Sequence, residues 1–190
     1  MRQEIRICGF GGQGVITGAV ILGKAAAVYD GLIACQVQSY GPEARGGAAR
    51  AEVIIADGQI GYPGIHTADI LVAMSQEAFS KYGREVKPDS IIIVDPDTVF
   101  SWEVSQTVHL VRSTKIAEGL GNVVVANIVM LGALTALSGV VSHEAILAAT
   151  LASVPARFKE LNRAALEAGI AAGMGQGDAV THGRRATAGR

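Results

Sequence analysis

Cysteine, aromatic side chains and charge are all scarce in this chain. Its 190 residues include two cysteines, Cys8 and Cys35, and only 5% aromatic and 17% charged residues. A four-thiolate iron–sulfur cluster or zinc site needs more cysteines than this, usually with C-x-x-C spacing. The four histidines are scattered without ligand spacing. We therefore expect no metal or cluster in this chain, and both cysteines are predicted to be buried, because a free cysteine behaves as a small hydrophobe.

Charge and hydropathy exclude further classes of protein. The net charge is −1, whereas nucleic-acid binding needs a basic face. No apolar run reaches the length of a membrane span, and residues 1–4 lead into a strand without an apolar signal segment. These features predict a cytoplasmic protein with no nucleic-acid or membrane partner. Because only 17% of the residues are charged, partners are expected to cover part of the surface.

Short apolar runs alternate with helix-like segments in the first half of the chain, which is typical of the α/β class. Strands are expected at 4–8, 32–37, 48–56, 68–74, 90–94 and 108–111, and helices at 13–29, 76–83, 122–137, 142–153 and 156–172. The Asp57-Gly58 turn predicts a β-hairpin that returns through residues 59–62. Ser75 and Ser142 are expected to cap helices.

This pattern predicts a single Rossmann-like domain over residues 1–172, which matches a normal domain size. Its sheet should be mostly parallel, with a β-hairpin and a helical C-terminal part. Residues 173–190 are rich in glycine and lack periodicity, so a disordered tail is expected there.

Two glycine-dense segments each follow a predicted strand. The first reads GFGGQGV and the second SYGPEARGG. Glycine suits backbone with positive φ or with a close neighbour, and loops beyond the carboxyl ends of strands form the ligand crevice of open α/β sheets. The candidate ligand- or partner-binding residues are Gly9, Gly11, Gly12, Gln13, Gly14, Ser39, Tyr40, Gly41, Pro42, Glu43, Arg45, Gly46 and Gly47.

The first segment has the letters of the dinucleotide fingerprint, Gly9-x-Gly11-x-x-Gly14, between a strand and a helix. A fingerprint enzyme also places an acidic side chain at the end of the second strand, but residues 36–39 here read QVQS. NAD or FAD binding is therefore disfavoured, and no lysine stands where a Walker A motif would need it. Two interpretations stay open: a tight turn without a ligand, and a phosphate or partner backbone at the helix N-terminus.

In the second segment, Tyr40, Glu43 and Arg45 are the only large side chains. Arg45 is either an internal partner of Glu43 or a ligand for an anion or a partner carboxylate, which guanidinium binds bidentately.

The remaining polar candidates are few. Asp95 and Asp97 follow a strand, where a helix-capping role is favoured, and Asn127 must find a partner if it is buried. No Ser/His/Asp or Cys/His arrangement and no thiamine diphosphate motif occurs, so no catalytic residue is predicted.

Four segments together resemble one protein family. GFGGQGV, QSYGPEARGG, ADILVAMSQEA and NIVMLGAL, at residues 9–15, 38–47, 68–78 and 127–134, are similar to the gamma subunit or gamma domain of the 2-oxoacid:ferredoxin oxidoreductases. The similarity is greatest to the 2-oxoglutarate enzyme, extends to the pyruvate and ketoisovalerate enzymes, and covers residues 4–172.

The resemblance implies a subunit of a complex that converts a 2-oxoacid, here 2-oxoglutarate, to its acyl-CoA and reduces ferredoxin. Thiamine diphosphate, Mg²⁺ and iron–sulfur clusters would lie in alpha, beta and ferredoxin-like delta subunits. The gamma subunit would be a companion on the coenzyme A side, inactive alone. Two alternatives are a free-standing nucleotide-binding or redox regulatory module and the small subunit of an indolepyruvate-type oxidoreductase.

Overall fold

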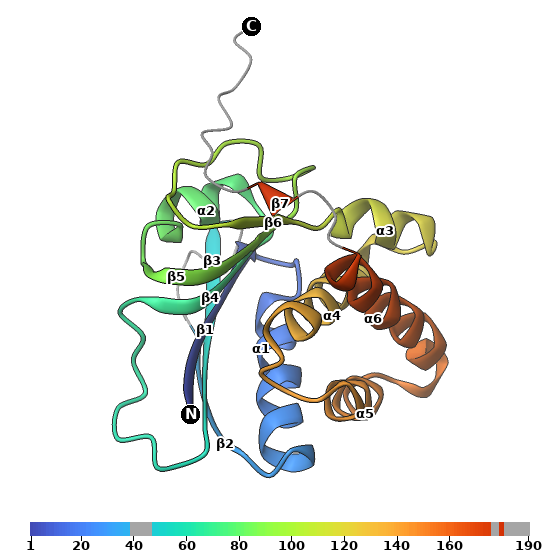
Figure 1. The fold of residues 1–190 in the computed structure, drawn as a ribbon. Helices are drawn as coiled ribbons and strands as arrows, with labels where there is room; N and C mark the ends of the chain where they lie inside the picture. Colours follow the sequence, from blue (N-terminus) through green and yellow to red (C-terminus); the bar gives the residue numbers. More distant parts are fainter. Residues whose placement is uncertain (39–46, 176–178, 181–190) are drawn as a thin grey trace, which may run out of the picture.

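The computed structural model describes residues 1–38, 47–175 and 179–180. A seven-stranded sheet with the order β2-β3-β1-β4-β5-β6-β7 forms its centre (Figure 1). The strands are β1 (Arg2–Phe10), β2 (Ile33–Gln38), β3 (Ala48–Ala56), β4 (Ala68–Ala73), β5 (Val86–Val94), β6 (Val108–Leu110) and β7 (Ala179–Val180).

Most strands of the sheet share one direction. β1, β4, β5 and β6 pair in parallel. β3 runs antiparallel to both β1 and β2, so β2 points the same way as β1, and β7 runs antiparallel to β6. Five of the seven strands therefore end at the same edge of the sheet, and the predicted mostly parallel α/β sheet is confirmed.

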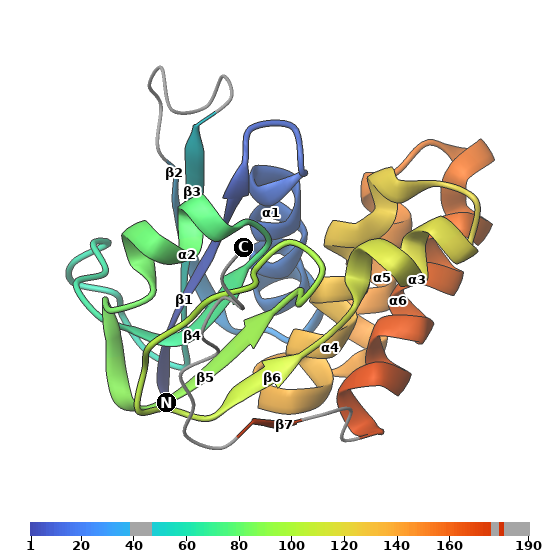
Figure 2. The same ribbon diagram turned by 90° about the horizontal axis from the view of Figure 1, so that it is seen from above.

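Helices cover both faces of the sheet unequally. In Figures 1 and 2, α1, α4, α5 and α6 gather on one face and α2 lies on the other. The helices are α1 (Val15–Lys24), which a π-helical segment (Ala25–Tyr29) continues, α2 (Gln76–Tyr82), α3 (Ser113–Gly119), α4 (Ala126–Ser138), α5 (His143–Ser153) and α6 (Lys159–Met174). The expected caps of α2 and α5 are present, since Ser75 and Ser142 accept hydrogen bonds from the N–H groups of Ala78 and Ala145.

The alternation along β1 shows how the two faces are built. Ile5 and Ile7 pack into the large core beneath α1 and α4, whereas Cys8 joins a smaller core around Phe79 and Trp102 beside α2. Successive strand side chains point to opposite faces, so the even-numbered residues of β1 belong to the α2 face. Arg6 is one of these, and it is completely buried.

The hairpin expected at Asp57-Gly58 is wrong. β3 already pairs with β1 along one edge and with β2 along the other, so a strand at 59–62 would have no free edge beside it. The strand next to β3 in the sequence that pairs with it in antiparallel fashion is β2. The β-hairpin of this fold is therefore β2–β3.

Other features differ in detail from the expectations. Helix α3 was not anticipated, and β5 begins at Val86 instead of residue 90.

Cys8 is buried as predicted, and desolvation raises the pKa of its thiol to about 12. Cys35 is only partly buried, because it lies on the edge strand β2. In the predicted tail, residues 173 and 174 complete α6 and 179–180 form β7, and most of the remainder lies outside the described residues.

Candidate functional site

The two glycine segments meet beyond the ends of β1 and β2. The N–H of Gly11 donates a hydrogen bond to the carbonyl of Gly47 at 3.4 Å, and Figure 2 shows the β1–α1 turn on the same side of the molecule as the beginning of β3. Six of the predicted site residues are placed here: Gly9, Gly11, Gly12, Gln13, Gly14 and Gly47. The other seven (Ser39, Tyr40, Gly41, Pro42, Glu43, Arg45 and Gly46) lie outside the described residues.

Gln13 organises the first glycine segment. Its Oε1 accepts a hydrogen bond from the Phe10 N–H at 2.6 Å, and its Nε2 donates to the Met74 carbonyl at 2.9 Å. A Cβ on Gly9 would lie 2.5 Å from Gln13 Oε1. The amide therefore ties the ends of β1 and β4 together, and Gly9 makes room for it.

Asn127 joins the first glycine segment to α4. Its side chain is only 8% exposed, and its Nδ2 donates to the Gly14 carbonyl at 3.2 Å. Gly14 has φ +71°, and a Cβ there would lie 2.4 Å from Asn127 Nδ2. The expectation that Asn127 finds a partner is confirmed, and the contact holds two motifs that are 113 positions apart in the sequence.

A cavity of about 340 Å³ opens beside this contact. Gly12, Gly14 and Thr17 form one wall, and side chains from the beginnings of α4 and α6, among them Asn127 and Asn162, form the others. None of its lining residues carries an ionisable group. A free phosphate would find no cation in these walls, so the cavity suits uncharged amide and apolar groups.

The sheet order separates this site from a dinucleotide site. In the dinucleotide fold, the second strand lies beside the first and supplies the acid for the ribose. Here antiparallel β3 lies between β1 and β2, and β2 ends in Gln36-Val37-Gln38. The fingerprint letters are present, but neither the neighbouring strand nor the carboxylate that gives them a dinucleotide function accompanies them.

Asp95 is not the N-cap residue of a helix, because Arg112 occupies that position in α3, but its carboxylate binds the first turn of the same helix. Its Oδ2 accepts hydrogen bonds from the Ser113 hydroxyl and from the N–H and hydroxyl of Thr114, all at 2.7 Å. This buried carboxylate fixes the first turn of α3. Asp97 forms an exposed ion pair with Arg112.

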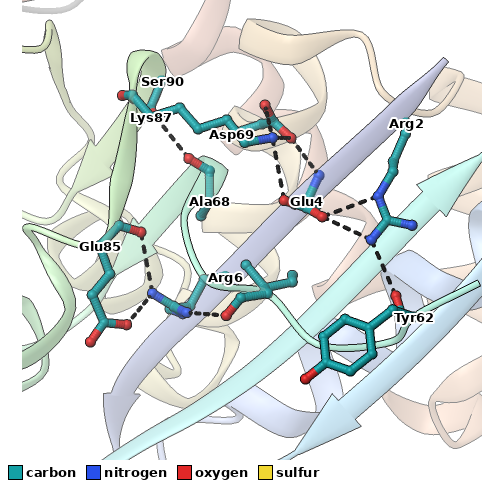
Figure 3. Close-up of polar contacts among 10 residues, drawn as sticks. Arg2, Glu4, Arg6, Tyr62, Ala68, Asp69, Glu85, Lys87 and Ser90 are labelled. Atoms are coloured by element: carbon teal, nitrogen blue, oxygen red, sulfur yellow. Dashed lines mark hydrogen bonds and ion pairs between the residues drawn. The ribbon is translucent and has the colours of Figure 1, made fainter.

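A network of ion pairs and hydrogen bonds on the α2 face of the sheet was not predicted from the sequence (Figure 3). Arg6 binds Glu85 at 2.7 Å, as Figure 3 shows. It also binds Glu52 at 2.9 Å and the Ile65 carbonyl at 3.1 Å. Nearby, Lys87 binds Asp69 at 2.9 Å. Burial alone would lower the pKa of Lys87, but hydrogen bonds to Asp69 and Glu4 raise it overall. The alternation of polar residues at positions 4 and 6 with Ile5 and Ile7 was the available signal.

The described part of the chain offers neither a cluster of metal ligands nor a membrane-spanning helix. Its His, Cys, Asp and Glu side chains form no group of three or more that could hold a metal ion. None of the helices in these ranges combines the length and apolarity needed to cross a membrane.

We expect Gln13→Ala to lower the free energy of unfolding by about 1–2 kcal/mol, because two hydrogen bonds at the end of β1 are lost. Amide exchange at Phe10 should become faster. Gln13→Glu keeps the acceptor for Phe10 but removes the donor for Met74, so it should preserve more of the Phe10 protection. Chemical denaturation and hydrogen exchange measure both quantities, and equal protection in the two variants would contradict the assigned role.

The geometry and the sequence motifs together define an α/β domain with a mostly parallel sheet, in which the first glycine segment forms the turn between β1 and α1. The chain belongs to the pyruvate ferredoxin/flavodoxin oxidoreductase family, whose model matches residues 4–172.

Relatives of known name are similar over nearly their full length. The chain is 51% identical to the 2-oxoglutarate synthase subunit KorC of Methanothermobacter marburgensis, covering 89% of this chain and 95% of the relative. It is 49% identical to KorC of Methanocaldococcus jannaschii, covering 89% and 92%. The crystal structure of a keto/oxoacid ferredoxin oxidoreductase gamma subunit from Geobacter sulfurreducens is 43% identical, with a TM-score of 0.86, covering 93% of this chain and 98% of that one. The resemblance inferred from the motifs is confirmed.

Proposed function

We propose that this chain is the gamma subunit of a 2-oxoglutarate:ferredoxin oxidoreductase in the cytoplasm. The observation that carries the proposal is the identity of about half of all residues to KorC subunits along almost their whole length. The substrate follows the name of these relatives. Oxidative decarboxylation would produce succinyl-CoA and reduced ferredoxin.

The division of labour follows from what this chain offers. The described residues hold no candidate metal group, and the sequence has no thiamine diphosphate motif. Alpha and beta subunits, with a ferredoxin-like delta subunit, would supply thiamine diphosphate, Mg²⁺ and the iron–sulfur clusters. The gamma subunit would then act as a structural companion on the side where coenzyme A reacts.

The sheet edge that carries both glycine segments is the face we assign to the catalytic partner. The Gly11–Gly47 contact brings the segments together, and glycine allows another backbone to approach closely. The adjoining cavity has uncharged walls. The predicted site residues among Ser39–Gly46 come directly before Gly47 in the chain. We therefore include them in the surface proposed to contact the catalytic partner.

Reconstitution tests the function. The alpha, beta and delta subunits should reduce ferredoxin with 2-oxoglutarate and coenzyme A only when this chain is added, and this chain alone should be inactive. Pyruvate, ketoisovalerate and indolepyruvate serve as competing substrates. Faster turnover of one of these would overturn the substrate assignment, and full activity without this chain would overturn its role as a subunit.

Arg45→Ala should raise the KM for coenzyme A in the assembled complex by about 10- to 100-fold, which corresponds to a lost charged hydrogen bond of about 1.5–3 kcal/mol. The melting temperature of the isolated chain should barely change. Arg84→Ala is the matched control, because Arg84 is highly exposed on the α2 side and only 3.6 Å from exposed Glu103. If Arg45 merely orders its loop by pairing with Glu43, Arg45→Ala will destabilise the isolated chain and leave the KM unchanged.

A further inference from the structure

Strand β2 is an edge strand without the usual protection. It stands at the end of the sheet order and pairs with β3 over six consecutive residues without a bulge. Its sequence, IACQVQ, contains no charge and no proline. Natural edge strands are commonly blunted by lysine, proline, a bulge or short length, because their free N–H and C=O groups invite another strand. β2 has none of these devices, and its other edge pairs with no strand of the described chain.

Apolar surface is present on both faces of this edge. On one face Ile33 and Val37 are 44% and 39% exposed, with Cys35 between them. On the other face lies α1, whose Gly23 is directed at Val53 of β3. Val20 lies one turn before Gly23, hence on the same side of α1, and it is 45% exposed. The edge is therefore apolar above and below the strand.

The pattern of β2 is complementary to itself. When two copies lie antiparallel with Cys35 opposite Cys35, Ile33 of each faces Val37 of the other. Both apolar pairs then form at once, and no like charges oppose each other, which is the pairing that stabilises antiparallel sheets. A shift by one residue would lose this match. Two-fold symmetric contacts of this kind are the commonest in homo-oligomers.

We propose that β2 pairs with β2 of a second copy of this chain, antiparallel and centred on Cys35, to form a symmetric dimer with one continuous sheet. This interface differs from the surface assigned above to the catalytic partner. The catalytic partner would contact the loops at the carboxyl ends of the strands, whereas the second copy would pair with the backbone along the length of β2. The dimer would bring two gamma subunits, and with them two sets of partners, into one assembly.

Cross-linking of the purified full chain tests the register directly. Sedimentation equilibrium should show twice the monomer mass, and mild oxidation should join the two copies through Cys35, which lies opposite itself. Cys8 provides no competing thiol, because it is completely buried and its pKa is raised to about 12. Cys35→Ser should abolish the covalent dimer and leave the mass in solution unchanged. A monomeric chain at about 100 μM, or a dimer that oxidation does not join, would overturn the proposal.

A charge on the strand provides the second test. Val37→Lys places a charge in each of the two apolar pairs and should raise the dimer dissociation constant by more than about tenfold. Val123→Lys is the control, since Val123 is 51% exposed and precedes α4, away from β2; it should leave the dimer intact. Circular dichroism verifies that both variants fold. If Val37→Lys remains dimeric, or if it releases another subunit of the complex without affecting self-association, the second copy is not the occupant of β2.

Discussion

Arg6→Met should lower the free energy of unfolding by about 3–5 kcal/mol, the usual cost of removing one partner of a buried ion pair. Arg6 is completely buried and Glu52 is 6% exposed. Without the guanidinium, Glu52 keeps Arg50, at 3.9 Å, as its one cation among the described residues, and the Ile65 carbonyl loses the hydrogen bond from Arg6. Urea denaturation at neutral pH measures the loss.

Arg2→Met is the matched control for Arg6→Met. Arg2 stands four residues earlier on β1 and on the same face, where it binds Glu4 at 2.8 Å (Figure 3), but its side chain is 38% exposed. Exposed ion pairs contribute only about 0.2–1 kcal/mol, so this substitution should have a small effect. Similar losses in the two variants would contradict the assignment of Arg6 as a buried structural charge.

A double substitution separates the buried charge from the lost packing. Arg6→Met/Glu52→Met removes both charges of the buried pair, and replacing a buried ion pair with apolar residues is often neutral or stabilising. The double variant should therefore be more stable than Arg6→Met alone. If it is less stable, the loss in Arg6→Met comes from packing against the Tyr82 ring, 5.7 Å from the guanidinium, and not from an unpaired Glu52.

The elements that local sequence determines were predicted well. β3 was located at residues 48–56 with its observed ends, and the starts of α2 and α5 follow from Ser75 and Ser142. In each case the signal lies within a few residues. It is an apolar run for β3, and for the helices it is a serine whose hydroxyl accepts a hydrogen bond from the N–H three residues later. The mostly parallel α/β class also follows from such local patterns.

Features that depend on distant partners could not be predicted from local pattern. The first turn of helix α3 is bound by Asp95, 18 positions earlier, and the Asp57-Gly58 turn forms no hairpin because β3 has no vacant edge. At the site, the sequence predicted the glycine segments, but it did not predict that Gln13 donates a hydrogen bond to the Met74 carbonyl. Asn127 was recognised as needing a partner, while the identity of that partner, Gly14, required the structure.

Gly169→Ala should lower the free energy of unfolding by about 3 kcal/mol or more, because α4 and α6 touch through their backbones. A Cβ on Gly169 would lie 2.0 Å from the Val129 carbonyl oxygen, and one on Gly132 would lie 2.2 Å from the Leu166 carbonyl oxygen. Backbone cannot rotate aside as a side chain can, so the helices must separate. Overpacking of this kind costs about 1–3 kcal/mol and occasionally more.

Gly119→Ala shows what the same substitution does without a clash. Gly119 ends α3, and a Cβ there meets no heavy atom within 4 Å, so alanine should leave stability unchanged or raise it by up to about 1 kcal/mol. The difference between the two variants isolates the cost of separating α4 from α6. Because Asn127 and Asn162 on these helices line the cavity beside the glycine loop, Gly169→Ala should also speed amide exchange around Gly14. A variant with unchanged stability and exchange would show that the α4–α6 contact is looser than the structure indicates.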